Sequence, residues 1–192
     1  MIALVLLLSA QALAAPKPIL KPLPKDKIPG MAALLKDSDV ALIESDAKGR
    51  LAQISILTWV GAPAKLVHDV VADLGKYNEV LANMSESKVS KNADGTADLY
   101  FVIRYTLVSF KGTTRHTFRE DGAIDLESTD PEDGARFRWE FIPLDEGTVL
   151  IMYGWTDVFH SPDVIQSMVK KVRTLEHGFV RLVDEAGMAL AG

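Results

Sequence analysis

The chain has 192 residues, no cysteine, 48% hydrophobic residues and a formal net charge of −5. This length suits one domain with a single sizeable core. The lack of cysteine excludes disulfide frameworks, thiol nucleophiles and cysteine-ligated metal sites. The acidic balance argues against a nucleic-acid partner, which would require a basic surface.

Residues 1–15 carry no charged side chain and begin with a continuous apolar run over 1–8. The small-x-small pattern at Ala12–Ala14 is typical of a signal-peptidase site. The segment therefore predicts a signal peptide that is cleaved after Ala14 or Ala15, and a protein that is exported, either periplasmic or secreted. An uncleaved interfacial anchor is the alternative.

Residues 16–30 contain five of the nine prolines and four lysines against one aspartate, a net charge of +3. Repeated proline predicts an extended, polyproline-like linker over 16–38. Its lysines either contact anionic lipid headgroups as a peripheral membrane contact or only solubilise a spacer. The folded domain is then expected over 39–192, as a monomer.

Within that domain, β-rich runs alternate with turn sequences, and one helical pattern interrupts them. Pro63 and the apolar residues of 66–74 predict a short helix, and a second short helix is expected over 76–82. The predicted strands are 40–44, 51–60, 86–90, 97–109, 112–120, 123–129, 135–142 and 148–159. Tight-turn sequences join consecutive later strands, so we expect an antiparallel meander.

A long C-terminal helix is predicted after Ser161-Pro162-Asp163, which reads as an N-cap followed by an acidic first turn. Apolar residues then recur every three or four positions from Val164 to Ala186. This stripe requires a matching apolar surface, which only the sheet can supply. The fold class is therefore α+β.

Two local segments carry a family resemblance: GAPA at 61–64 leading into VHDVVADLGKY at 67–77, and FHSP at 159–162. They resemble the START-like (SRPBCC) superfamily of polyketide cyclases, dehydratases and coenzyme-Q-binding proteins, over roughly residues 50–189. The opening segment is most similar to the coenzyme-Q-binding branch. The resemblance implies a helix-grip fold, in which a curved antiparallel sheet wraps the long C-terminal helix and two short helices follow the first long strand. It also implies an apolar cavity for a lipid, sterol, quinone or polyketide.

Strand alternation separates an apolar, aromatic face from a charged face that carries most of the arginines. Over 148–159 both alternating sets are apolar, so the pattern does not decide which one faces inward. We expect these ligand-binding residues: Phe101, Ile103, Tyr105, His116, Phe118, Trp139, Tyr153, Trp155, Met168 and Phe179. His116 is either a ligand contact or a neutral core histidine that is hydrogen-bonded to a neighbour such as Tyr105 or a backbone carbonyl.

No catalytic motif, metal-ligand spacing or cofactor motif occurs in the sequence, so no metal and no cofactor are expected. The sequence favours a noncatalytic carrier of an apolar lipid, quinone or sterol. A cyclase or dehydratase using His116 or Tyr105 as acid or base is one alternative. An envelope interaction module with a solid core is another.

Overall fold

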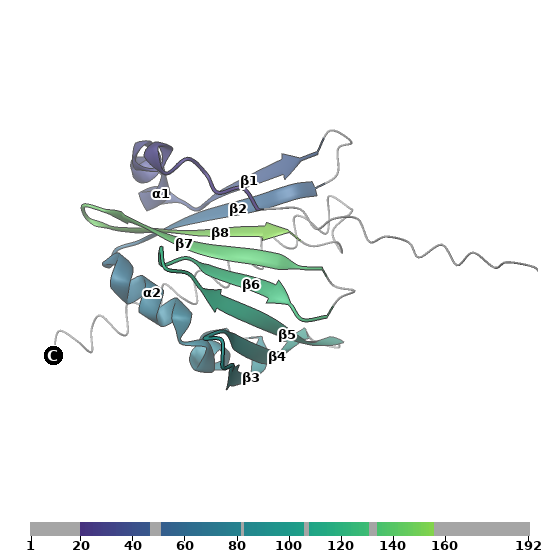
Figure 1. Ribbon diagram of the computed structural model, residues 1–192. Coiled ribbons are helices and arrows are strands. Elements are labelled where there is room, and N and C mark those ends of the chain that lie inside the picture. Colours follow the sequence, from purple (N-terminus) through teal and green to yellow (C-terminus); the bar gives the residue numbers. More distant parts are fainter. Residues whose placement is uncertain (1–19, 47–50, 82, 106–107, 131–133, 156–192) are drawn as a thin grey trace, which may run out of the picture.

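The computed structural model describes residues 20–46, 51–81, 83–105, 108–130 and 134–155. Eight antiparallel strands form one sheet in the order β1-β2-β8-β7-β6-β5-β4-β3 (Figure 1). The strands are β1 (Val40–Ser45), β2 (Leu51–Val60), β3 (Met84–Lys91), β4 (Ala97–Tyr105), β5 (Val108–Phe118), β6 (Ile124–Ser128), β7 (Arg136–Leu144) and β8 (Gly147–Trp155). The predicted meander is confirmed from β3 to β8, and β2 then joins β8 on its other side.

The helices are short, and two groups of them flank the sheet. Before β1 lie the 3-10 turns η1 (Lys25–Lys27) and η2 (Pro29–Met31) and the helix α1 (Ala32–Asp37). Between β2 and β3 lie α2 (Ala64–Ala72), η3 (Leu74–Lys76) and α3 (Tyr77–Val80). The two short helices expected after the first long strand are thus present, and Pro63 is the residue immediately before α2.

Two of the hairpin turns form where the sequence places glycine directly after aspartate. Gly95 and Gly122 have φ angles of 84° and 83°, a region that residues with a Cβ rarely enter. In the second turn the Arg119 amide donates to the carbonyl of Ala123, which closes the link between β5 and β6. The strand predicted over 97–109 differs from the structure, in which β4 ends at Tyr105 and β5 begins at Val108.

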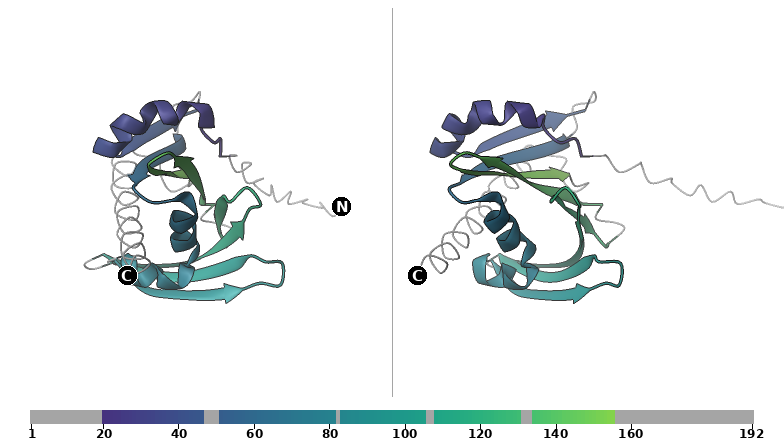
Figure 2. Two further views of the ribbon diagram at one scale, coloured as in Figure 1. Left: turned by 90° about the vertical axis from the view of Figure 1, so that its left-hand side faces the viewer. Right: turned by 60° about the vertical axis from the view of Figure 1, so that its left-hand side comes forward.

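The sheet is strongly curved, so that it has a concave and a convex face (Figure 2). The concave face forms an apolar cluster with α2, η3 and α3, in which Val67, Val71 and Leu74 are almost completely buried. The convex face forms a second apolar cluster with residues 20–35, in which Ile28 and Leu35 are buried. The sheet is therefore covered on both sides over part of its area.

The segment that covers the convex face was predicted to be part of an extended linker over 16–38, and the structure differs. Described residues 20–38 pack on β2, β7 and β8 as part of the domain. Ile28 is only 1% exposed and Leu35 only 2%. Apolar residues placed between the prolines and in α1 supply enough buried surface to hold this segment on the sheet.

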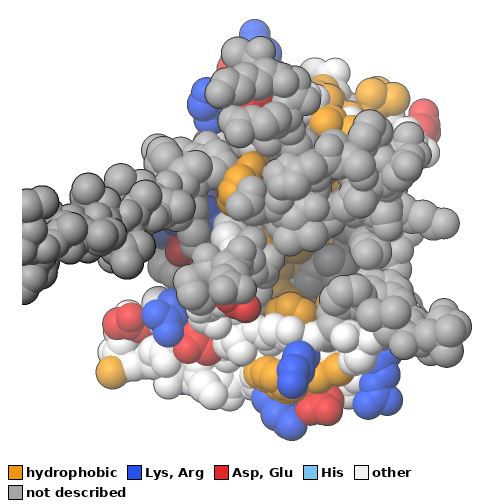
Figure 3. All heavy atoms as spheres, turned by 90° about the vertical axis from the view of Figure 1, so that its right-hand side faces the viewer, with side chains coloured by type: hydrophobic (Ala, Val, Ile, Leu, Met, Phe, Trp, Pro, Cys, Tyr) orange, Lys and Arg blue, Asp and Glu red, His pale blue; other side chains and the backbone are white. Residues whose placement is uncertain are grey.

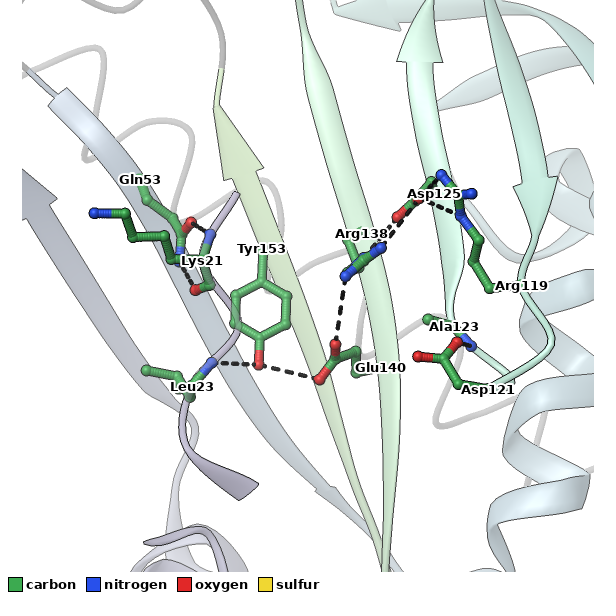
Figure 4. Close-up of polar contacts among 10 residues, drawn as sticks. All are labelled: Lys21, Leu23, Gln53, Arg119, Asp121, Ala123, Asp125, Arg138, Glu140 and Tyr153. Carbon is green, nitrogen blue, oxygen red and sulfur yellow. Dashed lines mark hydrogen bonds and ion pairs between the residues drawn. The ribbon is translucent and has the colours of Figure 1, made fainter. Parts of the chain in front are cut away.

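Side chains of the sheet also hydrogen-bond the backbone of this N-terminal segment (Figure 4). The Gln53 amide pairs with both backbone groups of Lys21: the Lys21 N–H donates to Gln53 Oε1 at 2.7 Å and Gln53 Nε2 donates to the Lys21 carbonyl at 2.8 Å. The Leu23 N–H donates to the Tyr153 hydroxyl at 3.0 Å. Pro22 and Pro24 have no N–H, so the backbone donors of 21–24 are those of Lys21 and Leu23. Side chains of the sheet accept hydrogen bonds from both.

The C-terminal helix predicted from Val164 to Ala186 lies outside the described residues. The described part is an α+β fold with a large curved antiparallel sheet, as predicted.

Candidate functional site

The concave face of the sheet is organised in rows of directly paired side chains. One row joins Ile124, Trp139 and Met152 across β6, β7 and β8. A second row joins His116, Leu126, Phe137 and Gly154 across β5 to β8. Because paired residues of an antiparallel sheet point to the same side, each row is a continuous band across the concavity.

The short helices close one part of this face. Tyr77, at the start of α3, donates its hydroxyl hydrogen to the Val71 carbonyl at 2.7 Å. Its ring meets that of His116 edge-on, with centroids 6.5 Å apart. Burial raises the pKa of Tyr77 further above its usual value, so the phenol stays neutral. This part of the concave face is solid core.

His116 is completely buried within it. Its Nε2 lies 3.0 Å from the Thr114 hydroxyl, and its Nδ1 has no hydrogen-bond partner among the described residues. Burial lowers the pKa of His116 to about 4, against a smaller opposing effect of the Asp98 carboxylate. The imidazole is therefore neutral at pH 7.

Another part of the concave face is only half-covered. Four of its apolar side chains keep partial exposure although they belong to the concave cluster: Phe101, Ile103, Leu126 and Phe137. Figure 3 shows hydrophobic side chains inside a hollow at the end of the molecule where β8 finishes. This half-open surface, rather than the buried part around His116, is where an apolar ligand could be accommodated.

The two faces differ in the charge of their polar groups. The buried polar groups on the concave side are His116, Thr58 and Thr148, all of them uncharged at pH 7. On the convex side Asp125 accepts hydrogen bonds from both Arg119 and Arg138 at 2.6 Å (Figure 4). These arginines hold the pKa of Asp125 below its usual value although burial acts in the opposite direction.

Comparison with solved structures identifies the architecture. The aromatase/cyclase Zhui from Streptomyces aligns with a TM-score of 0.61 and 17% identity, over 73% of this chain and 98% of that one. A START superfamily protein from Mycobacterium smegmatis aligns with a TM-score of 0.62 and 15% identity, over 70% and 98%. A STAR-related lipid transfer protein from Xanthomonas axonopodis aligns with a TM-score of 0.56 and 15% identity, over 75% of this chain and 98% of that one. The chain has a START-like fold. No family model and no curated protein matches its sequence.

Five of the predicted site residues lie on the concave face of this START-like sheet, namely Phe101, Ile103, His116, Phe118 and Trp139. Phe101 and Ile103 belong to its half-open part, and Trp139 and His116 to its buried part. Phe118 ends β5 and is 39% exposed, outside the concave cluster. The side chain of Tyr105 and the residues Met168 and Phe179 lie outside the described part of the chain.

Tyr153 and Trp155, which were expected to bind the ligand, lie on the opposite face of the sheet. Tyr153 is buried in the convex cluster, where its hydroxyl lies 3.4 Å from the Glu140 carboxylate. Trp155 pairs with Arg136, two positions further along the same side of β8. The inward set of β8 is instead Leu150, Met152 and Gly154, because these pair with the concave residues of β7.

Leu126 and Phe137 were missing from the predicted site list, although strand alternation places both on the inner face. What alternation does not give is depth. Residues of the half-open part and of the buried part alternate in the sequence with the same period of two. Only the positions of α2, η3 and α3 distinguish the two parts.

A second hollow, of about 280 Å³, lies between the start of α2, the β5–β6 turn and β7. It is lined by polar and charged side chains together with Phe141, Pro143 and small residues: Lys25, Lys65, His68, Asp121, Glu140, Ala64, Gly122 and Ala123. In the part of the chain that the structure describes, no group of three or more acidic or histidine side chains is placed to hold a metal ion. No described helix is long and apolar enough to span a membrane.

Proposed function

We propose that this protein binds an apolar small molecule, such as a lipid, quinone or sterol, without converting it chemically. The site is the half-open concave face of the sheet, beneath the C-terminal helix that the sequence predicts over 164–186. The observation that carries the proposal is the partial exposure of four members of the concave apolar cluster: Phe101, Ile103, Leu126 and Phe137.

The driving force for binding is removal of this apolar surface from water. Burial contributes about 25 cal/mol for each Å² of apolar surface, so an unfilled aromatic face favours occupation by an apolar molecule. The fold is also consistent with this role, since a solved lipid transfer protein and an aromatase/cyclase share it. Fold similarity does not select among ligands, and the ligand class has to be argued from the side chains.

The cyclase or dehydratase alternative requires an acid or base at the site, and the sequence offers His116 or Tyr105. His116 is completely buried, contacts Thr114 and has a pKa of about 4. Such an imidazole is a weak base at neutral pH and is not accessible from the half-open part. Binding without catalysis therefore accounts better for the described residues.

Native mass spectrometry of the purified protein, followed by organic extraction, tests the proposal. We expect an apolar molecule to accompany the wild-type chain or to bind from a panel of a phospholipid, a quinone and a sterol. Phe137→Asp places a charge in the half-open face and should abolish retention. Leu34→Asp, at a side chain 54% exposed on α1, is the matched control and should retain the ligand. A wild-type chain that neither carries nor binds any of these compounds contradicts the proposal.

We further propose that the protein is exported through the leader predicted over 1–15. Support comes from the uncharged apolar run and the small-x-small pattern that follows it. Expression of the full chain in a Gram-negative host and N-terminal sequencing of the periplasmic fraction provide the test. A mature chain beginning at Ala15 or Pro16 supports export, whereas an uncleaved chain confined to the cytoplasm contradicts it.

A further inference from the structure

Two phenylalanine rings of the concave face lie directly over glycines of the neighbouring strand. Phe137 and Gly154 are paired across β7 and β8, and Phe101 and Gly112 across β4 and β5. A Cβ added to Gly154 would sit 2.8 Å from Phe137 Cδ1 and 3.0 Å from Cε1. A Cβ added to Gly112 would sit 3.0 Å from Phe101 Cζ, with both Cε atoms within 3.7 Å. Each ring therefore occupies the space in which any other residue would place its side chain.

The consequence is two low aromatic patches in the concavity, one over each glycine, which are together called the floor here. Because the rings lie over glycine, they cover the sheet backbone instead of standing away from it. Both Phe101 and Phe137 remain partly exposed, while Trp139 nearby is 3% exposed. Each ring is thus an aromatic surface that the described residues leave partly uncovered. The two rings lie on different strand pairs, with the buried His116 between them.

Among the described residues, the floor also has no buried charged group. The one buried carboxylate among the described residues, Glu140, lies on the convex face with Tyr153 and Arg138. His116, between the two ring–glycine pairs, is kept neutral by its low pKa. A charged ligand group placed on this floor would lose its hydration and find no opposite charge there.

We propose that the ligand is a neutral compound with a planar ring system, which stacks on Phe137 or on Phe101, and that Gly154 and Gly112 determine this specificity. The inference rests on the proposed binding function and narrows its ligand class. Flat rings gain stacking interactions from an aromatic surface beyond the area they bury, whereas a saturated acyl chain gains only the burial. A fatty acid is disfavoured twice, by its flexible chain and by its carboxylate.

Fluorescence binding with 1-aminoanthracene, a neutral planar probe, tests the ring preference. The competitors are anthraquinone, 1-dodecanol and dodecanoate, which represent a neutral ring, a neutral chain and a charged chain. We expect anthraquinone to displace the probe at the lowest concentration and dodecanoate at the highest. Displacement by 1-dodecanol at the same or a lower concentration than anthraquinone overturns the ring preference.

Variants of the floor test the residues. Phe137→Leu keeps an apolar side chain but removes the ring, so we expect the affinity for 1-aminoanthracene to fall by about two- to tenfold, with 1-dodecanol binding unchanged. Gly154→Ala displaces the Phe137 ring from its position over the strand and should lower the affinity for 1-aminoanthracene by more than Phe137→Leu does. Gly61→Ala is the matched control, because a Cβ there meets nothing within 4 Å, and it should bind as the wild type does.

If a Phe137 or Gly154 variant fails to unfold cooperatively in urea, Phe101→Leu and Gly112→Ala repeat the test on the other pair. Equal losses of probe and 1-dodecanol in the phenylalanine variants overturn the stacking inference while leaving ligand binding intact. Failure of every neutral compound to bind the wild-type chain, with no apolar molecule found by native mass spectrometry, overturns the proposed function itself.

Discussion

His116 should make the folded state sensitive to mild acid. Burial lowers its pKa from 6.5 to about 4 in the folded chain. Between these values the unfolded chain binds a proton at His116 that the folded chain does not, so the free energy of unfolding decreases as the pH falls. The contribution is fully present above about pH 6.5 and is lost progressively as the pH approaches 4. For a shift of this size the loss between pH 7.5 and pH 5 is roughly 2 kcal/mol.

The test is urea unfolding, followed by circular dichroism, of the wild type and His116→Gln from pH 7.5 to pH 4.5. Glutamine cannot be protonated in this range, and its amide is able to contact Thr114. The free energy of unfolding should therefore depend less on pH in the variant, by roughly 2 kcal/mol at pH 5. Carboxylates titrate in both proteins, so they cancel in the difference between the two curves.

Two results would refute this reasoning. One is a pair of parallel curves, in which the wild type and His116→Gln lose the same stability on acidification. The other is an NMR titration of the His116 ring in the folded protein with a midpoint near 6.5. Either would mean that water or a charge reaches the imidazole and that this part of the concave face is not solid core.

Three further predictions concern the cover of the sheet and its packing. Gln53→Leu removes both hydrogen bonds to the Lys21 backbone, so the free energy of unfolding in urea should fall by about 1–3 kcal/mol. Trypsin should also cleave the chain faster before β1. Unchanged cleavage would contradict the anchoring role of Gln53. Ile28→Ala truncates a side chain 1% exposed and should cost about 2–5 kcal/mol, whereas Leu34→Ala, at a side chain 54% exposed, should cost less than about 0.5 kcal/mol; equal costs would argue against the packed N-terminal segment. Gly147→Ala places a Cβ 2.5 Å from the Val60 carbonyl oxygen, so the melting temperature should fall and the free energy of unfolding should decrease by about 1–3 kcal/mol. An unchanged melting temperature would show that the hairpin backbone shifts to accommodate the methyl group.

The two main differences between prediction and structure have one physical cause. Residues 16–38 were predicted as a linker because of the prolines and lysines in 16–30, yet the described residues 20–38 cover the convex face. Strand β8 lies under this cover and is therefore buried on both sides, which removes the alternation that would have shown its inward face. Tyr153 was assigned to the concavity for this reason. Recognition of the cover would have corrected both.

Strands β4, β6 and β7 were predictable because one of their faces is polar. Along β7, Arg136, Arg138 and Glu140 alternate with Phe137 and Trp139, and the structure keeps that division. Phe118 shows the limit of the method: it has the same period as His116, but it ends its strand and is 39% exposed. Alternation predicts a side of the sheet and does not predict how far a residue lies from its edge.

The sequence by itself determined the α+β class, the order of strands and short helices, and the apolar side of the central strands, because these depend on local period and turn chemistry. Only the tertiary structure decided which part of the concave face is core and which is half-open. It also decided that an N-terminal segment rich in proline packs on the convex face, and that two phenylalanine rings lie over glycines. Each of these depends on contacts between residues far apart in the chain, for which no local pattern exists.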